Sequence, residues 1–92
     1  RFSAGAWLVE LANQTDPHMV AATVAAAFRL EVNDASSATT TVMHYLRDKE
    51  TLLLLDNCEH LVDAVASLVE SLLAVSPQLQ VIKGRSAIND RK

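Results

Sequence analysis

The segment 51–63, TLLLLDNCEHLVD, constrains the fold of this chain more than any other part of it. The leucine run from Leu52 to Leu55 has no polar face, and so short an apolar run is typical of a strand buried on both sides in a parallel sheet. The run ends at Asp56, and an amphipathic helical pattern follows directly. A strand that passes into a helix in this way predicts an α/β fold, with Asp56 at the carboxyl edge of the sheet.

Further strands and helices are expected around this central strand. Strand-like runs occupy residues 6–11, 51–55 and 79–83. Helical patterns occupy residues 17–30, 41–48 and 58–75. Asp16 and Pro17 favour a helix start, because the carboxylate can accept from free first-turn amides and proline there sacrifices no hydrogen bond. Since strands alternate with helices, we predict a three-stranded parallel sheet with flanking helices, in one domain over residues 1–92.

The charge and the cysteine content of the chain limit the partners and the cellular compartment that we expect for it. The net charge is -3, and the basic residues are dispersed apart from a small cluster at residues 83–92, so we expect no direct nucleic-acid contact. No apolar run approaches the roughly 20 residues that span a bilayer, so we expect no membrane contact. The single cysteine, Cys58, fits a reducing, cytoplasmic setting. Because the chain starts at Arg1 and has no signal-peptide pattern, we expect it to be part of a longer protein.

Asp56 admits two interpretations from its position alone. A carboxylate at the end of a buried strand can hold a magnesium ion, usually through water, beside nucleotide phosphates. Alternatively, Asp56 or Asn57 is the N-cap of the following helix. The two roles are compatible, and spacing does not decide between them.

The wider text resembles one family of nucleotide-binding proteins. Residues 52–61, LLLLDNCEHL, resemble the Walker B segment of the STAND-class P-loop ATPase modules in AfsR- and LuxR-like bacterial transcription regulators, some of which are fused to adenylate cyclase domains. Similar text occurs at residues 5–11 (GAWLVEL), 15–17 (TDP), 45–48 (YLRD) and 79–82 (LQVI). The resemblance therefore covers about residues 4–83.

This resemblance implies a partial P-loop NTPase core of the ASCE type that lacks the P-loop strand. In the intact parent protein, Asp56 would bind Mg²⁺ and thereby ATP, and the partners would be the remainder of the ATPase module and the output domains. The P-loop, GxxxxGK[ST], would lie on a strand and helix before Gly5, and nothing in this sequence matches it. We therefore expect no bound cofactor and no ATPase activity for this chain alone.

Two positions depart from the family pattern. Many related ATPases have a second acid after the Walker B aspartate, but this chain has Asn57, whose amide cannot take a proton. Glu59 is the nearest acid and the candidate catalytic residue, although an exposed first-turn glutamate is the simpler interpretation. After the last strand, Arg85 is the candidate sensor of a γ-phosphate, or else a solvated basic residue.

Other functions have less support in the sequence. The acidic, thiol and imidazole groups at Asp56, Cys58, Glu59 and His60 lack the spacing of a zinc site, and Cys58 is expected to pack as a small apolar residue. The titratable residues form no convergent catalytic set. The alternative to the switch module is a small α/β interaction module that forms a homo-oligomer through an exposed sheet edge at residues 79–82, or a degenerate remnant without a nucleotide role.

Overall fold

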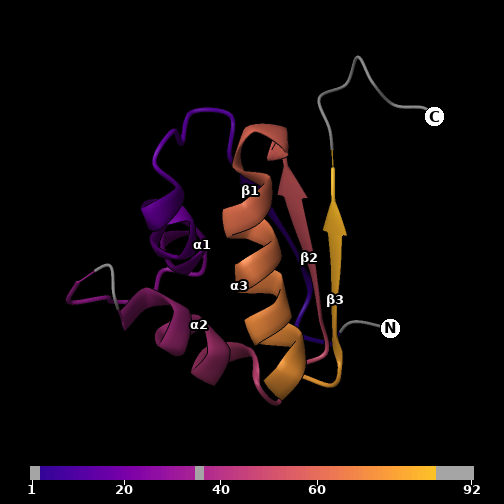
Figure 1. Ribbon diagram of the computed structural model, residues 1–92. Helices are drawn as coiled ribbons and strands as arrows, with labels where there is room; N and C mark the ends of the chain where they lie inside the picture. Colours follow the sequence, from indigo (N-terminus) through magenta and orange to yellow (C-terminus); the bar gives the residue numbers. More distant parts are fainter. Residues whose placement is uncertain (1–2, 35–36, 85–92) are drawn as a thin grey trace.

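The structure is a computed structural model that describes residues 3–34 and 37–84. The strands are β1 (Ala6–Glu10), β2 (Thr51–Asp56) and β3 (Leu79–Lys83). The helices are α1 (Val20–Ala27), α2 (Ala38–Leu46) and α3 (Val62–Val75), and the 3-10 turns η1 (Pro17–Met19) and η3 (Glu59–Leu61) precede α1 and α3. All strand pairs are parallel, in the order β1-β2-β3 (Figure 1). The predicted α/β fold with a three-stranded parallel sheet is confirmed.

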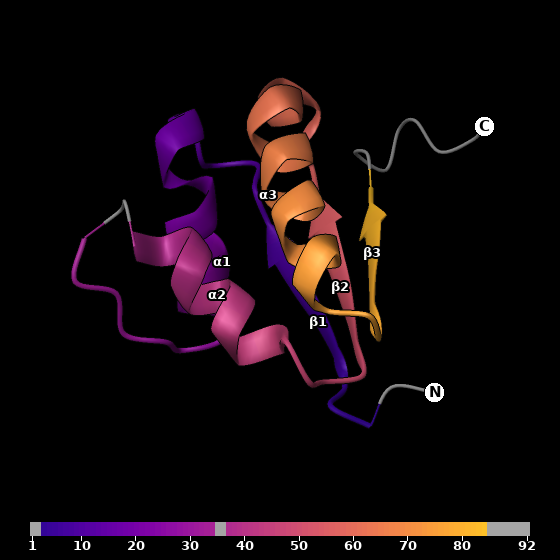
Figure 2. The same cartoon turned by 60° about the horizontal axis from the view of Figure 1, so that its bottom comes forward.

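The leucine-rich strand β2 is the central strand, as its composition predicts. Its alternate residues Thr51, Leu53 and Leu55 are fully buried, because α1, α2 and α3 all lie on that side of the sheet (Figure 2). Truncating one of these leucines to alanine would cost about 2–5 kcal/mol. The core on this side also contains a chain of ring contacts, Trp7 to Phe28 at 4.9 Å and Phe28 to Tyr45 at 5.1 Å between centroids.

The other side of the sheet has no helix over it in the part of the chain that the structure describes. Leu8, Leu54 and Ile82 are register partners across the three strands and form an apolar row on this open face. Leu8 is 62% exposed and Ile82 is 51% exposed. Parallel sheets are normally covered on both faces, so this row is an unusual surface for a complete domain.

The boundaries of the first two helices differ from the prediction. The first helix was expected to reach residue 30 but ends at Ala27, because Arg29 adopts a left-handed conformation (φ 60°). The amide of Leu30 then donates to the carbonyl of Ala25 at 3.0 Å, which closes the helix as a Schellman motif.

The second helix was expected at residues 41–48 but runs from Ala38 to Leu46. Its first residues, Ala38 to Thr40, were expected to end a polar loop, because the text before residue 41 is rich in serine and threonine and threonine is a poor helix former. Ala38, Val42 and Leu46 form a fully buried stripe at a spacing of four residues, and this packing outweighs the low propensity.

The third helix was expected to start at residue 58, but residues 59–61 form a 3-10 turn and the α-helix begins at Val62. The apolar pattern gave no sign of this change in pitch. In the described part of the chain, no helix has both the length and the apolar character needed to cross a membrane.

Candidate functional site at the carboxyl edge of the sheet

Asp56 is the last residue of β2 and lies at the carboxyl edge of the sheet. The strand alternation places its half-buried side chain on the open face, and its register partner on β1 is Glu10. The amide of Gly84 donates to the carbonyl of Leu55 at 2.7 Å, which brings the chain after β3 beside Asp56. A Cβ atom at Gly84 would lie only 3.0 Å from Oδ1 of Asp56, so glycine leaves room for the carboxylate.

Neither Asp56 nor Asn57 is the N-cap of the following helix, so that alternative interpretation is wrong. Cys58 occupies the N-cap position of η3 and Leu61 that of α3, and neither makes a side-chain capping bond. Oδ1 of Asp56 instead accepts from the amide of Asn57 at 3.0 Å. The turn after β2 thus orients the Asp56 carboxylate, and this carboxylate does not cap the helix.

Asn57 holds this turn through a contact that the sequence did not reveal. Its φ of 56° lies in the left-handed region, which asparagine tolerates better than most residues. Its Nδ2 donates to both carboxylate oxygens of Glu10, at 2.9 and 3.0 Å. Glu10 also accepts from the amide of Ala12 at 3.0 Å. We call this contact the Glu10–Asn57 clip; it joins the ends of β1 and β2.

Glu10 is the residue at this edge that sequence reasoning missed. A signal was present, because Glu10 ends an apolar strand just as Asp56 does, and parallel strands bring such residues to one edge. The sequence suggested for Asn57 a possible N-cap role and an amide that cannot take a proton. In the structure it has a positioning role instead.

The candidate catalytic residue Glu59 is an exposed residue of η3. It lines a cavity of about 190 Å³ on the helix-covered side of the sheet, together with Cys58, Lys83 and Gly84. Asp56 does not line this cavity, so Glu59 and Asp56 lie at the same edge without sharing a pocket. Arg85, the candidate sensor, lies outside the described residues.

Cys58 packs as the sequence suggested, as a small buried residue. Its Sγ lies 3.6 Å from the carbonyl of Leu55 and 3.8 Å from that of Gly84. Burial raises the pKa of the thiol, and the negative charge of Glu59 raises it further. The thiol therefore stays protonated at neutral pH and is a poor nucleophile or metal ligand.

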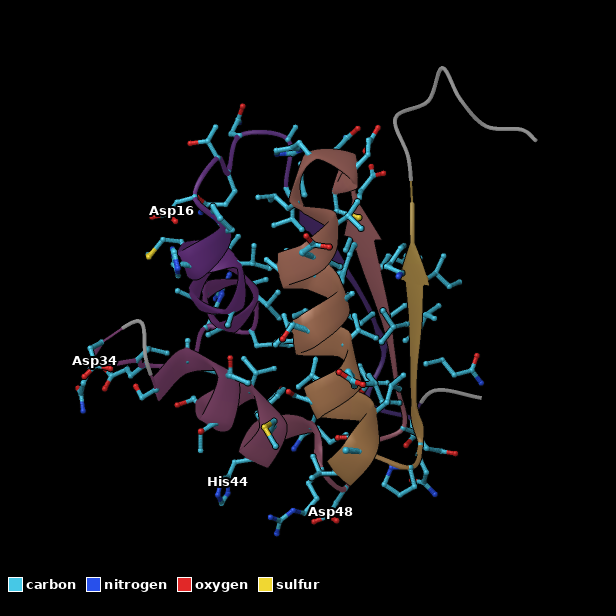
Figure 3. All side chains as sticks on the ribbon, viewed as in Figure 1. Asp16, Asp34, His44 and Asp48 are labelled. Carbon is cyan, nitrogen blue, oxygen red and sulfur yellow. The ribbon has the colours of Figure 1, made fainter. Side chains whose placement is uncertain are left out.

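The histidines and remaining acids do not join this edge as a metal or catalytic cluster. No group of three or more potential metal ligands occurs in the part of the chain that the structure describes. Nε2 of His60 lies 2.7 Å from the carbonyl of Gln14, so this ring links η3 to the loop after β1. His44 and Asp48 lie near the C-terminal end of α2, at the opposite end of the molecule from the carboxyl ends of the strands (Figure 3).

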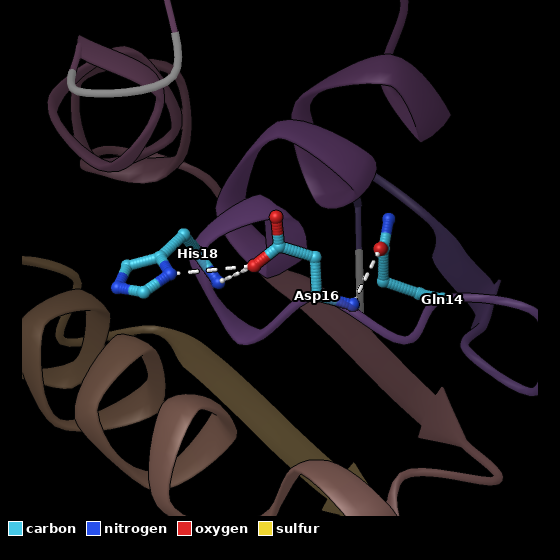
Figure 4. A network of polar contacts seen from close by, with 3 residues as sticks. All are labelled: Gln14, Asp16 and His18. Atoms are coloured by element: carbon cyan, nitrogen blue, oxygen red, sulfur yellow. Dashed lines mark hydrogen bonds and ion pairs between the residues drawn. The ribbon is translucent and has the colours of Figure 1, made fainter.

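His18 belongs to the cap of the first helical segment. Oδ1 of Asp16 accepts from the backbone amide of His18 at 2.9 Å and lies 3.3 Å from its Nδ1 (Figure 4). Oε1 of Gln14 accepts from the amide of Asp16 at 3.0 Å. The predicted helix start at Asp16 and Pro17 is confirmed.

The chain is similar to longer mycobacterial proteins. It is 38% identical over 81 residues to an uncharacterized protein of Mycobacterium tuberculosis and to one of Mycobacterium bovis, which is 88% of this chain and 21% of each relative. It is also 38% identical over 78 residues to a protein named "Putative HTH-type transcriptional regulator" in each of these species, which is 85% of this chain and 9% of that relative. No family model and no solved structure matches the chain.

The chain thus spans about a fifth of the length of the first relatives and about a tenth of the length of the second. It is related in sequence to proteins that are named as transcriptional regulators.

Proposed function

We propose that this chain is the Walker B-containing part of the ATP-binding switch module of a transcription regulator. The observation that carries the proposal is the position of Asp56, which ends the central strand of a parallel sheet with its carboxylate beside Gly84. In open α/β sheets, ligands gather at this carboxyl edge. The relation to named transcriptional regulators supports the biological setting.

The sheet topology supports the presence of a further strand and helix in the intact module. Both connections, β1 to β2 and β2 to β3, advance in one direction and place their helices on one face (Figure 2). Because crossovers are right-handed, a helix over the open face must belong to a connection that runs the opposite way along the sheet. A strand beside β3 that leads to β1 through such a helix meets this requirement.

A P-loop strand and helix would occupy this place. The helix would begin at the same carboxyl edge as Asp56, where its free amides and the P-loop lysine would bind phosphates. It would also cover the row of Leu8, Leu54 and Ile82, in which Leu54 is half-buried and the two outer members are exposed.

The residues at the edge fit a magnesium ion in their chemistry, because Mg²⁺ prefers carboxylate oxygens and retains several waters. Asp56 would hold the ion, which would neutralise charge on the nucleotide phosphates. The Glu10–Asn57 clip would keep the turn after β2 in place. No P-loop occurs in this sequence to hold the nucleotide phosphates, so this chain alone would have no catalytic activity. Asn57 supplies no base, and Glu59 and Arg85 remain candidates for roles in the intact protein.

A second function, a small interaction module, is favoured by one observation. The open face exposes Leu8 and Ile82, and β3 has a strand partner on one side only among the described strands. An exposed edge and an apolar face of this kind promote pairing with a second copy. Self-association would cover the surface that the missing helix would cover in the switch module.

Nucleotide titration of two polypeptides tests the proposed function. One is this 92-residue chain, and the other is the longer protein that contains it together with the residues encoded before Arg1. We expect saturable Mg²⁺–ATP binding by calorimetry for the longer protein and none tighter than about millimolar for the chain alone, because the phosphate contacts lie on the P-loop. A longer protein without a GK[ST] motif that fails to bind ATP would contradict the proposal and favour the interaction module.

A further inference from the structure

Helix α3 has a second apolar face in addition to the one that packs on the sheet. Its buried face is formed by Val65, Leu68 and Leu72. A separate stripe is formed by Val62, Ala66, Val69 and Leu73. The spacing of four, three and four residues places this stripe along one side of the helix over about three turns.

This α3 stripe is exposed in the structure. Val62 is 59% exposed and Leu73 is 47% exposed, while Ala66 is exposed and Val69 is half-buried. A solvent-facing helix side of this composition is unusual, because the exposed side of an amphipathic helix is normally polar.

The stripe lines a groove between α3 and the end of β3. Ala66, Val69 and Leu73 border a shallow cavity of about 560 Å³, and Lys83 of β3 closes its side. Lys83 and Val62 also line the cavity of about 190 Å³ described above. Val62 lines one cavity and the other three stripe residues line the other, so hollows accompany the stripe along its length. Amphipathic helices dock in apolar grooves through anchors at this kind of spacing.

The charges around the groove determine which partner fits. Asp63 and Glu70 lie together on the side of the stripe that faces away from the sheet, Glu59 lies near the N-terminal end of the stripe, and α3 has no basic residue. Lys83 is the one basic side chain among the described residues that line the two cavities. The groove is therefore apolar with a mainly acidic border.

This border disfavours several occupants. Pairing of α3 with α3 of a second copy would bring Asp63 and Glu70 of one copy close to the same residues of the other, and like charges across an interface oppose association. Nucleic acid and anionic lipid are disfavoured for the same electrostatic reason. A helix with basic flanks instead places opposite charges beside the acidic border.

We propose that the α3 groove binds an amphipathic helix of a partner segment, with Lys or Arg on the side of its apolar stripe that faces Asp63 and Glu70. The apolar stripes would pack against each other, and the basic side chains would lie beside these two acids, away from Lys83. This interaction uses neither Asp56 nor the open face of the sheet.

Two synthetic helices of about 20 residues test the proposal, a length at which an isolated helix can form. Both have leucine at positions a and d of each heptad; the basic probe has lysine at e and g, and the acidic probe has glutamate there. Fluorescence anisotropy of the labelled peptides with the 92-residue chain is measured at low salt. We expect saturable binding of the basic probe, with affinity at least about tenfold higher than that of the acidic probe, as two or three surface ion pairs would give.

Three variants locate the binding. Leu73→Glu, at an exposed position, should reduce binding of the basic probe at least tenfold, by roughly the cost of a charge in an apolar contact. The control Leu8→Glu, on the opposite face of the sheet, should leave it unchanged. The charge reversal Asp63→Lys with Glu70→Lys should make the acidic probe the tighter binder and does not depend on how the Leu73 variant folds.

Circular dichroism of each variant verifies the fold. Absence of binding, equal binding of the two probes, or binding that Leu73→Glu leaves unchanged would overturn the proposal. Self-association of the chain that Leu73→Glu abolishes would also overturn it, because a second copy would then be the occupant.

Discussion

The Glu10–Asn57 clip makes a quantitative prediction about the turn after β2. Asn57 contributes a side chain that donates to both oxygens of Glu10 and a backbone in the left-handed conformation. Asn57→Gly removes the side chain, and glycine adopts the left-handed backbone conformation without strain. Asn57→Ala also removes the side chain, but alanine is unfavourable in this conformation. Comparing the two variants therefore separates the clip from the backbone conformation.

The expected sizes follow from the geometry. Two amide-to-carboxylate hydrogen bonds at an exposed site contribute about 1 kcal/mol together, after screening by solvent. A non-glycine residue other than asparagine in the left-handed region costs about 1 kcal/mol more. We therefore expect the free energy of unfolding to fall by about 1 kcal/mol in Asn57→Gly and about 2 kcal/mol in Asn57→Ala, or roughly 5 and 10 °C in Tm for a domain of this size.

Urea denaturation of the single variants, of Glu10→Ala and of the double variant Glu10→Ala with Asn57→Gly provides the assay. The double-mutant cycle cancels the separate bond from Ala12 to Glu10 and should give a coupling energy of about 1 kcal/mol between Glu10 and Asn57. A coupling energy near zero would refute the clip. Equal losses in Asn57→Gly and Asn57→Ala would refute the role of the backbone conformation.

Three further predictions concern stability and association. Oγ1 of Thr51 is buried and has no hydrogen-bond partner among the described residues, so Thr51→Val should raise the free energy of unfolding by about 1 kcal/mol in urea titrations, and a loss would show that the hydroxyl is satisfied. Because the pKa of Cys58 is raised above its ordinary 9.0 in the folded chain, the unfolded thiol ionises first and stability should fall as pH rises above about 9; Cys58→Ala should remove this part of the slope, and an unchanged slope would contradict it. Light scattering should show that the chain self-associates, and the double variant Leu8→Lys with Ile82→Lys on the open face should shift it toward monomer. A well-folded, monomeric wild type would contradict association through the exposed sheet edge and open face.

The central part of the fold could be predicted because a few residues determine it strongly. Four leucines in succession are compatible with few environments other than a central parallel strand, and β2 occupies that place. Asp16 followed by Pro17 fixed the start of the first helical segment, since both residues favour that position for separate physical reasons. The alternation of strands and helices then left the parallel sheet as the natural topology.

Element ends were less predictable because tertiary contacts set them. The start of α2 depends on the burial of Ala38, and the threonine-rich sequence that follows Ala38 does not indicate a helix there. The end of α1 depends on a left-handed Arg29, a conformation for which glycine or asparagine would have been the usual signal.

The candidate site was predictable in its location but less so in its local contacts. Asp56 lies at the expected sheet edge, because strand direction alone places it there. The contact between Glu10 and Asn57 joins residues far apart in the sequence, and periodicity carries no information about such a pair. The open face likewise results from the placement of α1, α2 and α3 on one side of the sheet, which no local pattern in the sequence indicates (Figure 2).

The most direct test of the proposed switch module is the Mg²⁺ dependence of ATP affinity in the longer protein that contains this chain. Asp56→Asn removes the charge that would hold the ion, while Asp48→Asn, at an exposed position at the opposite end of the molecule from the carboxyl ends of the strands, is the matched control (Figure 3). We expect Mg²⁺ to tighten ATP binding in the wild type and in Asp48→Asn, and this gain to fall at least about tenfold in Asp56→Asn, since a hydrogen bond to a charged group is worth roughly 1.5–3 kcal/mol. The same Mg²⁺ dependence in Asp56→Asn as in the wild type would contradict the assignment of Asp56.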